Sequence, residues 1–177
     1  DGTTTGTGYT VAAINADYKN VTQVNDSEKF TYNSNGDVSK AGVYYNYCAA
    51  SAGTICDASN SNNAQYDICP KGWRLPTDGS DANTSEFRSL ANNLGNVTSG
   101  NLAGDAYRNF KAAFHAGLSG TFSNGSVQSQ TGSVFFWSST RGSYNSMYFL
   151  YLNAATVFPQ DSYRRFDGQS VRCVYGG

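Results

Sequence analysis

The stretch that decides the fold is Ile68-Cys69-Pro70-Lys71-Gly72-Trp73-Arg74-Leu75-Pro76-Thr77. Its two prolines fix their own φ angles, and its glycine permits backbone conformations that other residues avoid. Together these residues predict a rigid, extended turn around two large buried side chains, Trp73 and Leu75. Such a turn belongs to the framework of a folded domain.

The whole chain is long enough for one ordinary domain, or for one domain with an arm. It has 177 residues, of which 39% are hydrophobic, so it can bury a core of its own. Charged residues make up only 14%, against about 25% in an ordinary soluble protein. The net charge of -1 provides no field that would attract nucleic acid or an anionic membrane. We therefore expect no nucleic-acid binding. No apolar run approaches the roughly 20 residues of a membrane span, so we also expect no direct membrane insertion.

The cysteines are Cys48, Cys56, Cys69 and Cys173, and four cysteines allow three pairings. A zinc site is not indicated, because no C-x-x-C pair is present and the only histidine is His115. The even number of cysteines and the low-charge composition favour two disulfides and an oxidising compartment. The alternative is a cytosolic protein with four buried free thiols. We therefore expect an extracellular protein, either secreted or displayed on a cell surface.

Two helices are expected after the turn. Thr84 or Ser85 is suited to cap a helix that runs through residues 86–90. A second helix is expected at 105–114, and Gly117 is suited to end it. The aromatic residues that share one face of this second helix are Tyr107, Phe110 and Phe114.

Short strands are expected on both sides of the helices. Residues 43–47 have strand composition, and Asn124-Gly125 is a hairpin signal. Helices followed by strands favour an α+β domain, which we place at 42–177. The mostly polar residues 1–41 are expected to form an N-terminal arm, packed on the domain or flexibly joined to it. The strands after the helices are expected near 118–122, 133–138, 146–152 and 169–174.

Four motifs stand in a fixed order along the chain. They are Tyr45-Asn46-Tyr47-Cys48-Ala49-Ala50-Ser51-Ala52-Gly53-Thr54, Ile68-Cys69-Pro70-Lys71-Gly72-Trp73-Arg74-Leu75-Pro76-Thr77, Phe136-Trp137-Ser138-Ser139-Thr140 and Gly168-Gln169-Ser170-Val171-Arg172-Cys173-Val174. In this order they closely resemble the Fibrobacter succinogenes major paralogous domain, which is also abundant in surface proteins of Saccharibacteria and related small-genome bacteria. The resemblance covers about residues 42–175, and the Trp-Met-x-x-Asn-Leu motif usual upstream in the family is absent.

The resemblance implies a C-type-lectin-like fold, stapled by disulfides, with two helices and a mostly antiparallel sheet. It also implies that Cys69 pairs with Cys173 and that Cys48 pairs with Cys56. The first bridge would join the turn to the last strand. In the chain-entropy model, closing a loop of about 100 residues stabilises the fold by about 4.7 kcal/mol, against about 2.6 kcal/mol for the short loop.

The sequence does not favour catalysis, and we expect that the chain is not an enzyme. His115 is far in sequence from any candidate nucleophile. The Arg-Leu-Pro-Thr stretch is also similar to formylglycine-generating enzymes, but those enzymes need a pair of reactive cysteines, and the implied Cys69–Cys173 bridge occupies the candidates here.

Calcium-dependent sugar binding is not indicated either. Neither Phe158-Pro159-Gln160-Asp161 nor Trp137-Ser138-Ser139 matches the calcium motifs of sugar-binding C-type lectins. The oxygen-rich stretch 78–83 is more typical of a solvated loop before a helix, and a structural calcium ion there is the lesser alternative. We therefore expect no metal site and no cofactor.

The segment 141–167 has the composition of a binding surface. Tyrosine provides a large, rigid contact area, and asparagine and arginine provide adaptable hydrogen bonds. The candidate ligand-binding residues are Arg141, Tyr144, Asn145, Phe149, Tyr151, Asn153, Gln160, Asp161, Tyr163 and Arg165.

Alternation along the strand at 146–152 decides which of these side chains are accessible. If Tyr148, Leu150 and Leu152 face the core, Phe149, Tyr151 and Asn153 lie outside. The opposite alternation, with Met147, Phe149 and Tyr151 inside, is the alternative. We favour the first assignment.

Together with the resemblance, which implies a bacterial surface protein, these observations predict an extracellular recognition or adhesion domain. Its partner would be a glycan or a protein on another cell or surface, bound near residues 141–167. The alternative is a structural subunit or tip of a surface layer or filament, in which the same face serves self-assembly.

Overall fold

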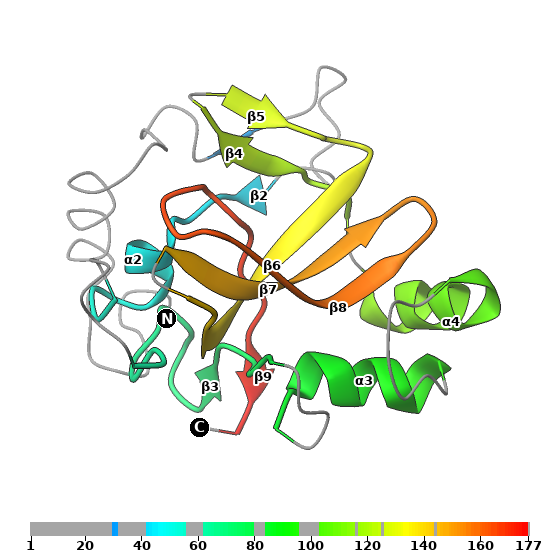
Figure 1. Ribbon diagram of the computed structural model, residues 1–177, viewed down its shortest axis with the longest axis horizontal. Helices are drawn as coiled ribbons and strands as arrows, with labels where there is room; N and C mark the ends of the chain where they lie inside the picture. The colour runs from blue at the N-terminus through cyan, green and yellow to red at the C-terminus, as the bar shows by residue number, and fades with distance from the viewer. Residues whose placement is uncertain are drawn as a thin grey trace.

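The computed structural model describes residues 30–31, 42–55, 62–79, 84–95, 103–115, 117–124, 126–143 and 145–176. Within these ranges the chain is α+β, as expected, and the named strands pair antiparallel (Figure 1). No helix in these ranges is long and apolar enough to cross a membrane. The elements are β1 (Phe30–Thr31), β2 (Gly42–Val43), α2 (Tyr47–Ala50), β3 (Trp73–Arg74), α3 (Glu86–Gly95), α4 (Gly104–Phe114), β4 (Thr121–Ser123), β5 (Ser126–Gln128), β6 (Ser133–Arg141), β7 (Ser146–Asn153), β8 (Val157–Arg164) and β9 (Val174–Tyr175).

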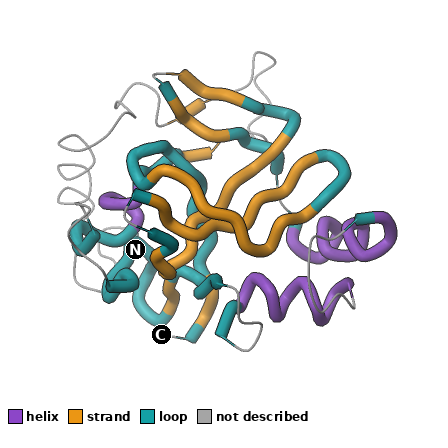
Figure 2. Tube along the Cα trace, in the orientation of Figure 1, coloured by secondary structure: helices purple, strands orange, loops and turns teal. Residues whose placement is uncertain are grey.

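The centre of the molecule is a three-stranded sheet in the order β6-β7-β8. In Figure 1, α3 and α4 lie together at the lower right, beside β8, and the hairpin of β4 and β5 lies at the top, above the central sheet. The short β3–β9 pair lies below the sheet, next to the C-terminus. Figure 2 shows the same arrangement, with the two long helices on one side of a body made mainly of strands and loops.

One face of the central sheet packs on the two long helices. Phe87 and Ala91 come from α3, and α4 contributes the three aromatic residues Tyr107, Phe110 and Phe114, which were expected to share one face; all five are buried. Their partners on the sheet are Val134, Phe136, Leu150, Leu152 and Val157.

The other face of the sheet packs on the turn segment. Trp137 is fully buried there, and its indole Nε1 donates a hydrogen bond of 2.7 Å to the carbonyl oxygen of Tyr45. Leu75 is also fully buried in this cluster, which confirms its expected position in the core. Met147 and Phe149 of β7 belong to the same cluster. Because Leu150 and Leu152 pack on the helices, β7 is buried on both faces, and the expectation that one face is accessible is wrong.

Both helices form where they were expected. The hydroxyl oxygen of Ser85 accepts a hydrogen bond of 3.0 Å from the backbone N–H of Arg88, so Ser85 caps the start of α3. At the other helix, α4 ends at Phe114, and His115 adopts the left-handed conformation with φ 48°. The left-handed residue that stops the helix is therefore His115, two residues before the expected stop, Gly117.

The strand expectations are partly confirmed. A hairpin joins β4 to β5, and Asn124 in its turn has φ 52°, as the Asn-Gly signal predicts. The expected strand at 43–47 is wrong beyond Val43, because α2 begins at Tyr47. Asn46 favours that helix, since its side-chain oxygen accepts a hydrogen bond of 2.9 Å from the N–H of Ala49.

Strand β8 was not expected. It lies at one edge of the central sheet, and it contains Pro159, which lacks the N–H that an inner strand needs. Its second half carries four consecutive exposed residues, Asp161 to Arg164. Because of these features, a search for alternating apolar residues does not identify this strand.

A disulfide ties the turn to the end of the chain. Cys69 and Cys173 are bonded, with their Cα atoms 5.8 Å apart across 104 positions of sequence, which confirms the pairing that the resemblance implied. Cys48 is also disulfide-bonded, but its expected partner, Cys56, lies outside the described residues. Of the expected arm at 1–41, only β1 is described, and it pairs with β2.

Candidate functional site

Five of the predicted ligand residues gather at one end of the central sheet. We name this group the open end: Arg141, Asn145, Asp161, Tyr163 and Arg165. Arg141 and Tyr163 lie on either side of Met147 in the strand register. The backbone N–H of Arg165 donates to the carbonyl oxygen of Asn145 at 3.0 Å.

The open end is accessible, and both backbone and side-chain hydrogen bonds hold it. Tyr163 is 41% exposed, and its ring packs edge-on against Phe149 with 6.4 Å between centroids. Asn145 and Asp161 are exposed, and Arg141 and Arg165 are half-buried. The N–H of Arg141 donates to Asn63 Oδ1 at 3.0 Å, which joins this end of β6 to the loop before the turn.

Phe149 is not part of an accessible surface. Only 2% of it is exposed, and it packs between Trp137 and Tyr163. The expectation that it faces outward is wrong, because the turn segment covers this face of β7 just as the helices cover the other.

Tyr151 and Asn153 have structural contacts elsewhere on β7. The half-buried ring of Tyr151 lies 4.9 Å from Phe135 and 5.2 Å from Phe158, measured between centroids. Asn153 lies at the far end of the strand and its Oδ1 accepts hydrogen bonds within the turn that follows. Gln160 is half-buried in the middle of β8. Tyr144 lies outside the described residues.

A pocket of about 520 Å³ is lined largely by the turn segment between Asp67 and Thr77, and we name it the turn pocket. Trp73 stands in its wall and is 46% exposed, so the expectation that this side chain is buried is wrong. Tyr66, also in the wall, is 50% exposed. The lining residues are Ala64, Gln65, Tyr66, Asp67, Lys71, Gly72, Trp73, Arg74, Leu75, Thr77 and Ser139.

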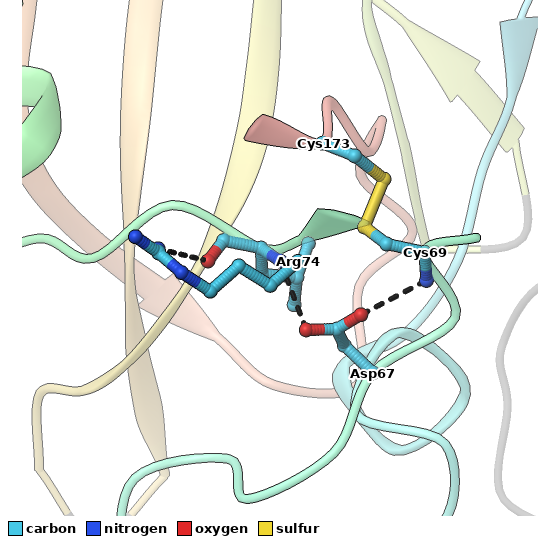
Figure 3. Close-up of a disulfide and its surroundings, with 5 residues drawn as sticks. Asp67, Cys69, Arg74 and Cys173 are labelled. Atoms are coloured by element: carbon cyan, nitrogen blue, oxygen red, sulfur yellow. Dashed lines mark hydrogen bonds between the residues drawn. A yellow bond between two sulfur atoms is a disulfide. The ribbon is translucent and has the colours of Figure 1, made fainter. Parts of the chain in front are cut away.

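Asp67 holds the turn in shape from inside. Its carboxylate oxygens accept hydrogen bonds of 2.9 Å from the N–H of Cys69 and of 2.9 Å from the N–H of Leu75. Figure 3 shows this carboxylate beneath the Cys69–Cys173 bridge. Burial raises the pKa of Asp67, and these two hydrogen bonds oppose that shift.

An ion pair with Glu86 holds the side chain of Arg74, which follows Trp73 in the turn. The guanidinium of Arg74 contacts both carboxylate oxygens of Glu86, at 2.6 and 2.8 Å. This pairing lowers the pKa of Glu86 and raises that of Arg74. Glu86 also accepts from the N–H of Thr77 at 2.9 Å, so the start of α3 is joined to the turn.

A buried carboxylate lies at the start of the stretch considered for calcium. Asp78 is 3% exposed, and burial raises its pKa to about 7. Its Oδ1 accepts from the N–H of Gly79 and the hydroxyl of Ser85. Residues 80–83 lie outside the described ranges, and within those ranges no three His, Cys, Asp or Glu side chains form a group that could hold a metal.

The turn pocket was missed by the sequence analysis. Lys71 and Gly72 indicate a turn that reaches the surface, since a charged side chain stands before a glycine with φ +83°. The hydrogen bond of 2.8 Å from the N–H of Trp73 to the carbonyl oxygen of Pro70 closes that turn. A charged, glycine-containing turn directly before the tryptophan was the signal that Trp73 is near the surface.

Comparisons with family models, with curated proteins and with solved structures found no match to this chain.

Proposed function

We propose that this chain is an extracellular recognition domain of a bacterial surface protein, with a C-type-lectin-like fold. It binds a glycan or a protein on another surface through the open end. The observation that carries the proposal is the position of Tyr163, Asn145 and Asp161, exposed at the end of a sheet whose middle strand, β7, is buried on both faces. A rigid aromatic ring between amide, carboxylate and guanidinium groups is a common composition of binding surfaces.

We propose that the chain acts by binding and not by catalysis with a nucleophile and a base. His115 is exposed at the end of α4. Cys48, Cys69 and Cys173 are all held in disulfides, so none of them offers a thiolate. An extracellular location accords with these disulfides, which persist in oxidising compartments.

Binding of the disulfide-intact chain to a glycan array tests the proposal, with immobilised cell-surface proteins as a second arm. We expect Tyr163→Ala and Arg165→Ala each to weaken binding by about tenfold or more, as for central contact residues. Arg108→Ala is the matched control, because Arg108 is an exposed arginine on α4. Equal binding by Tyr163→Ala and the unmodified chain would contradict the assignment of the open end.

The structural alternative predicts a different result. A layer or filament subunit would assemble with itself as its concentration rises, without any added ligand. The edge strand β8 disfavours strand-to-strand assembly, because Asp161 and Arg164 are exposed on it. We therefore expect sedimentation to show a monomer at micromolar concentration, and ordered assembly would favour the alternative.

A further inference from the structure

The turn pocket presents an exposed tryptophan that is held in one position. Trp73 pairs with Tyr175 across β3 and β9, and the two rings meet edge-on with 5.7 Å between centroids. The disulfide at Cys69–Cys173 lies at the base of the same strand pair. An aromatic ring that is already ordered loses little conformational entropy when a ligand packs on it. Trp73 is therefore suited to be a binding platform.

The turn before Trp73 needs its glycine. Gly72 has φ +83°, the conformation of the third residue of a type II turn, which side chains with a Cβ rarely adopt. This turn places Lys71 and Trp73 together in the wall of the pocket. A cation and an aromatic face are thus presented side by side by one rigid element.

Most charges around the pocket are already paired. Arg74 is bound to Glu86, and the carboxylate of Asp67 is held by two backbone N–H groups. Lys71 is exposed, and among the described residues that line the pocket it is the one charged side chain with no hydrogen bond or ion pair. The charge that the pocket offers to a ligand is therefore positive.

The remaining polar groups suit a ligand that carries hydroxyls. Gln65 and Tyr66 are exposed, and they provide an amide and a phenol beside the tryptophan. The pocket volume of about 520 Å³ lies within the range of small-molecule sites, which is about 300 to 1,000 Å³. An aromatic face packs well against the C–H face of a pyranose ring, and the amide and phenol can bind its hydroxyls.

We propose that the turn pocket binds an acidic sugar, a hexuronic acid residue of a polysaccharide. The pyranose ring packs on Trp73, and its carboxylate is bound by Lys71. This inference deepens the proposed recognition function by naming a second contact region and a ligand class. The two regions adjoin, since Ser139 lines the pocket and Arg141 of the open end follows two residues later on β6.

Tryptophan fluorescence of the whole chain gives a direct test. The chain has two tryptophans, and Trp137 is fully buried, so acrylamide quenching reports on Trp73. We expect oligogalacturonate to protect Trp73 from acrylamide, and a neutral cello-oligosaccharide of equal length to protect it far less. Added salt should weaken the protection, because the contact with Lys71 is exposed. No protection by oligogalacturonate would overturn the proposal, as would protection by an acidic peptide alone.

Two variants and one control separate the contribution of the Lys71 charge from that of the Trp73 ring. Lys71→Gln should weaken oligogalacturonate binding by about tenfold and bring it close to that of the neutral oligosaccharide. Lys111→Gln removes the same charge from α4 and should leave binding unchanged. Trp73→Ala should abolish binding measured by calorimetry, while the emission of Trp137 reports whether the core is intact.

Two outcomes distinguish this proposal from the proposed function. Failure of oligogalacturonate to protect Trp73, with array binding still lost in Tyr163→Ala, would overturn the acidic-sugar site and leave the open end as the recognition surface. Protection of Trp73 with array binding unchanged in Tyr163→Ala would support the turn pocket and contradict the open end. Equal effects of Lys71→Gln and Lys111→Gln would overturn the role of Lys71.

Discussion

The two ends of the central sheet contain the same residue types, but at one end their polar side chains bond within the fold and at the other end they are exposed. At the far end of β7, which we name the closed end, Asn153 Oδ1 accepts from the N–H of Ala155 at 2.8 Å and from the N–H of Thr156 at 2.8 Å. The hydroxyl of Tyr107 donates to the carbonyl oxygen of Asn153 at 2.8 Å and joins this turn to α4. The polar groups of the closed end are therefore used to hold the fold.

At the open end, backbone groups do this work together with the side chain of Arg141, whose Nε donates to the carbonyl oxygen of Ser143 at 3.1 Å. The N–H groups of Gly142 and Ser143 both donate to the carbonyl oxygen of Ser146, at 3.1 and 2.9 Å. Among the described residues, the side chains of Asn145 and Tyr163 form no hydrogen bond. Asparagine and tyrosine thus support the fold at one end and remain accessible at the other, so composition alone cannot separate a structural turn from a binding surface.

The largest predicted effect is the loss of the Cys69–Cys173 disulfide, which holds the segment on which the open end rests. The N–H of Ser139 donates to the carbonyl oxygen of Pro76 at 2.8 Å, so the end of β6 rests on the segment that Cys69–Cys173 ties down. Replacing both cysteines, Cys69→Ser with Cys173→Ser, should lower the free energy of unfolding by about 4 to 5 kcal/mol, because the bridge closes a loop of about 100 residues. Chemical denaturation measures this change.

Hydrogen exchange of the same double variant sharpens the comparison. We expect the amide of Ser139 to lose more protection than the amide of Asn153, which is held within its own turn. Uniform loss at both ends would mean that the disulfide stabilises the whole fold and does not specifically support the open end.

A pair of matched substitutions tests the comparison itself. Asn153→Ala should lower the free energy of unfolding by about 2 kcal/mol, because it removes the acceptor of three hydrogen bonds. Asn145→Ala, at the open end, should change it by less than about 0.5 kcal/mol. Thermal unfolding of the two variants measures the difference, and equal losses would contradict the division between the ends.

The parts of the fold that local chemistry decides were predictable from the sequence. The helices α3 and α4 were expected from the cap at Ser85 and from the aromatic residues on one face of α4. The hairpin at Asn124 was expected from its turn signal. Pairing of Cys69 with Cys173 came from the family resemblance, since spacing leaves three pairings open.

The candidate site was less predictable, because side-chain direction depends on what packs nearby. Period-2 alternation assigns Phe149 to the surface only if one face of the strand is free, and β7 lies between two clusters. The apolar run from Met147 to Leu152 was a sign of such a strand. The turn around Trp73 was identified from its prolines and glycine, but turn chemistry fixes the backbone and not the direction of the ring.

The smallest predicted effect is the part of a pH dependence that falls between pH 6 and pH 8, and this dependence belongs to the open end. Asp78 is buried beneath it, and its N–H donates to the hydroxyl of Thr140 on β6 at 2.9 Å. Burial, with a smaller contribution from the charge of Asp161, raises its pKa to about 7, against the opposing effect of its hydrogen bonds from Gly79 and Ser85 and of the charge of Arg88. In the unfolded chain its pKa is about 3.9, so between these values the folded state holds a proton that the unfolded state has lost.

Stability should therefore fall as the pH rises from about 4 towards 7 and level off above that. Between pH 6 and pH 8 the loss attributable to this carboxyl is about 1.4 kcal/mol. Asp78→Asn should abolish that part of the pH dependence in denaturation curves, because an amide does not titrate. Asn153→Ala should keep it, since the closed end has no titrating side chain in its turn. A pH profile unchanged by Asp78→Asn would show that other groups control it, and the pH dependence could then not be assigned to the open end.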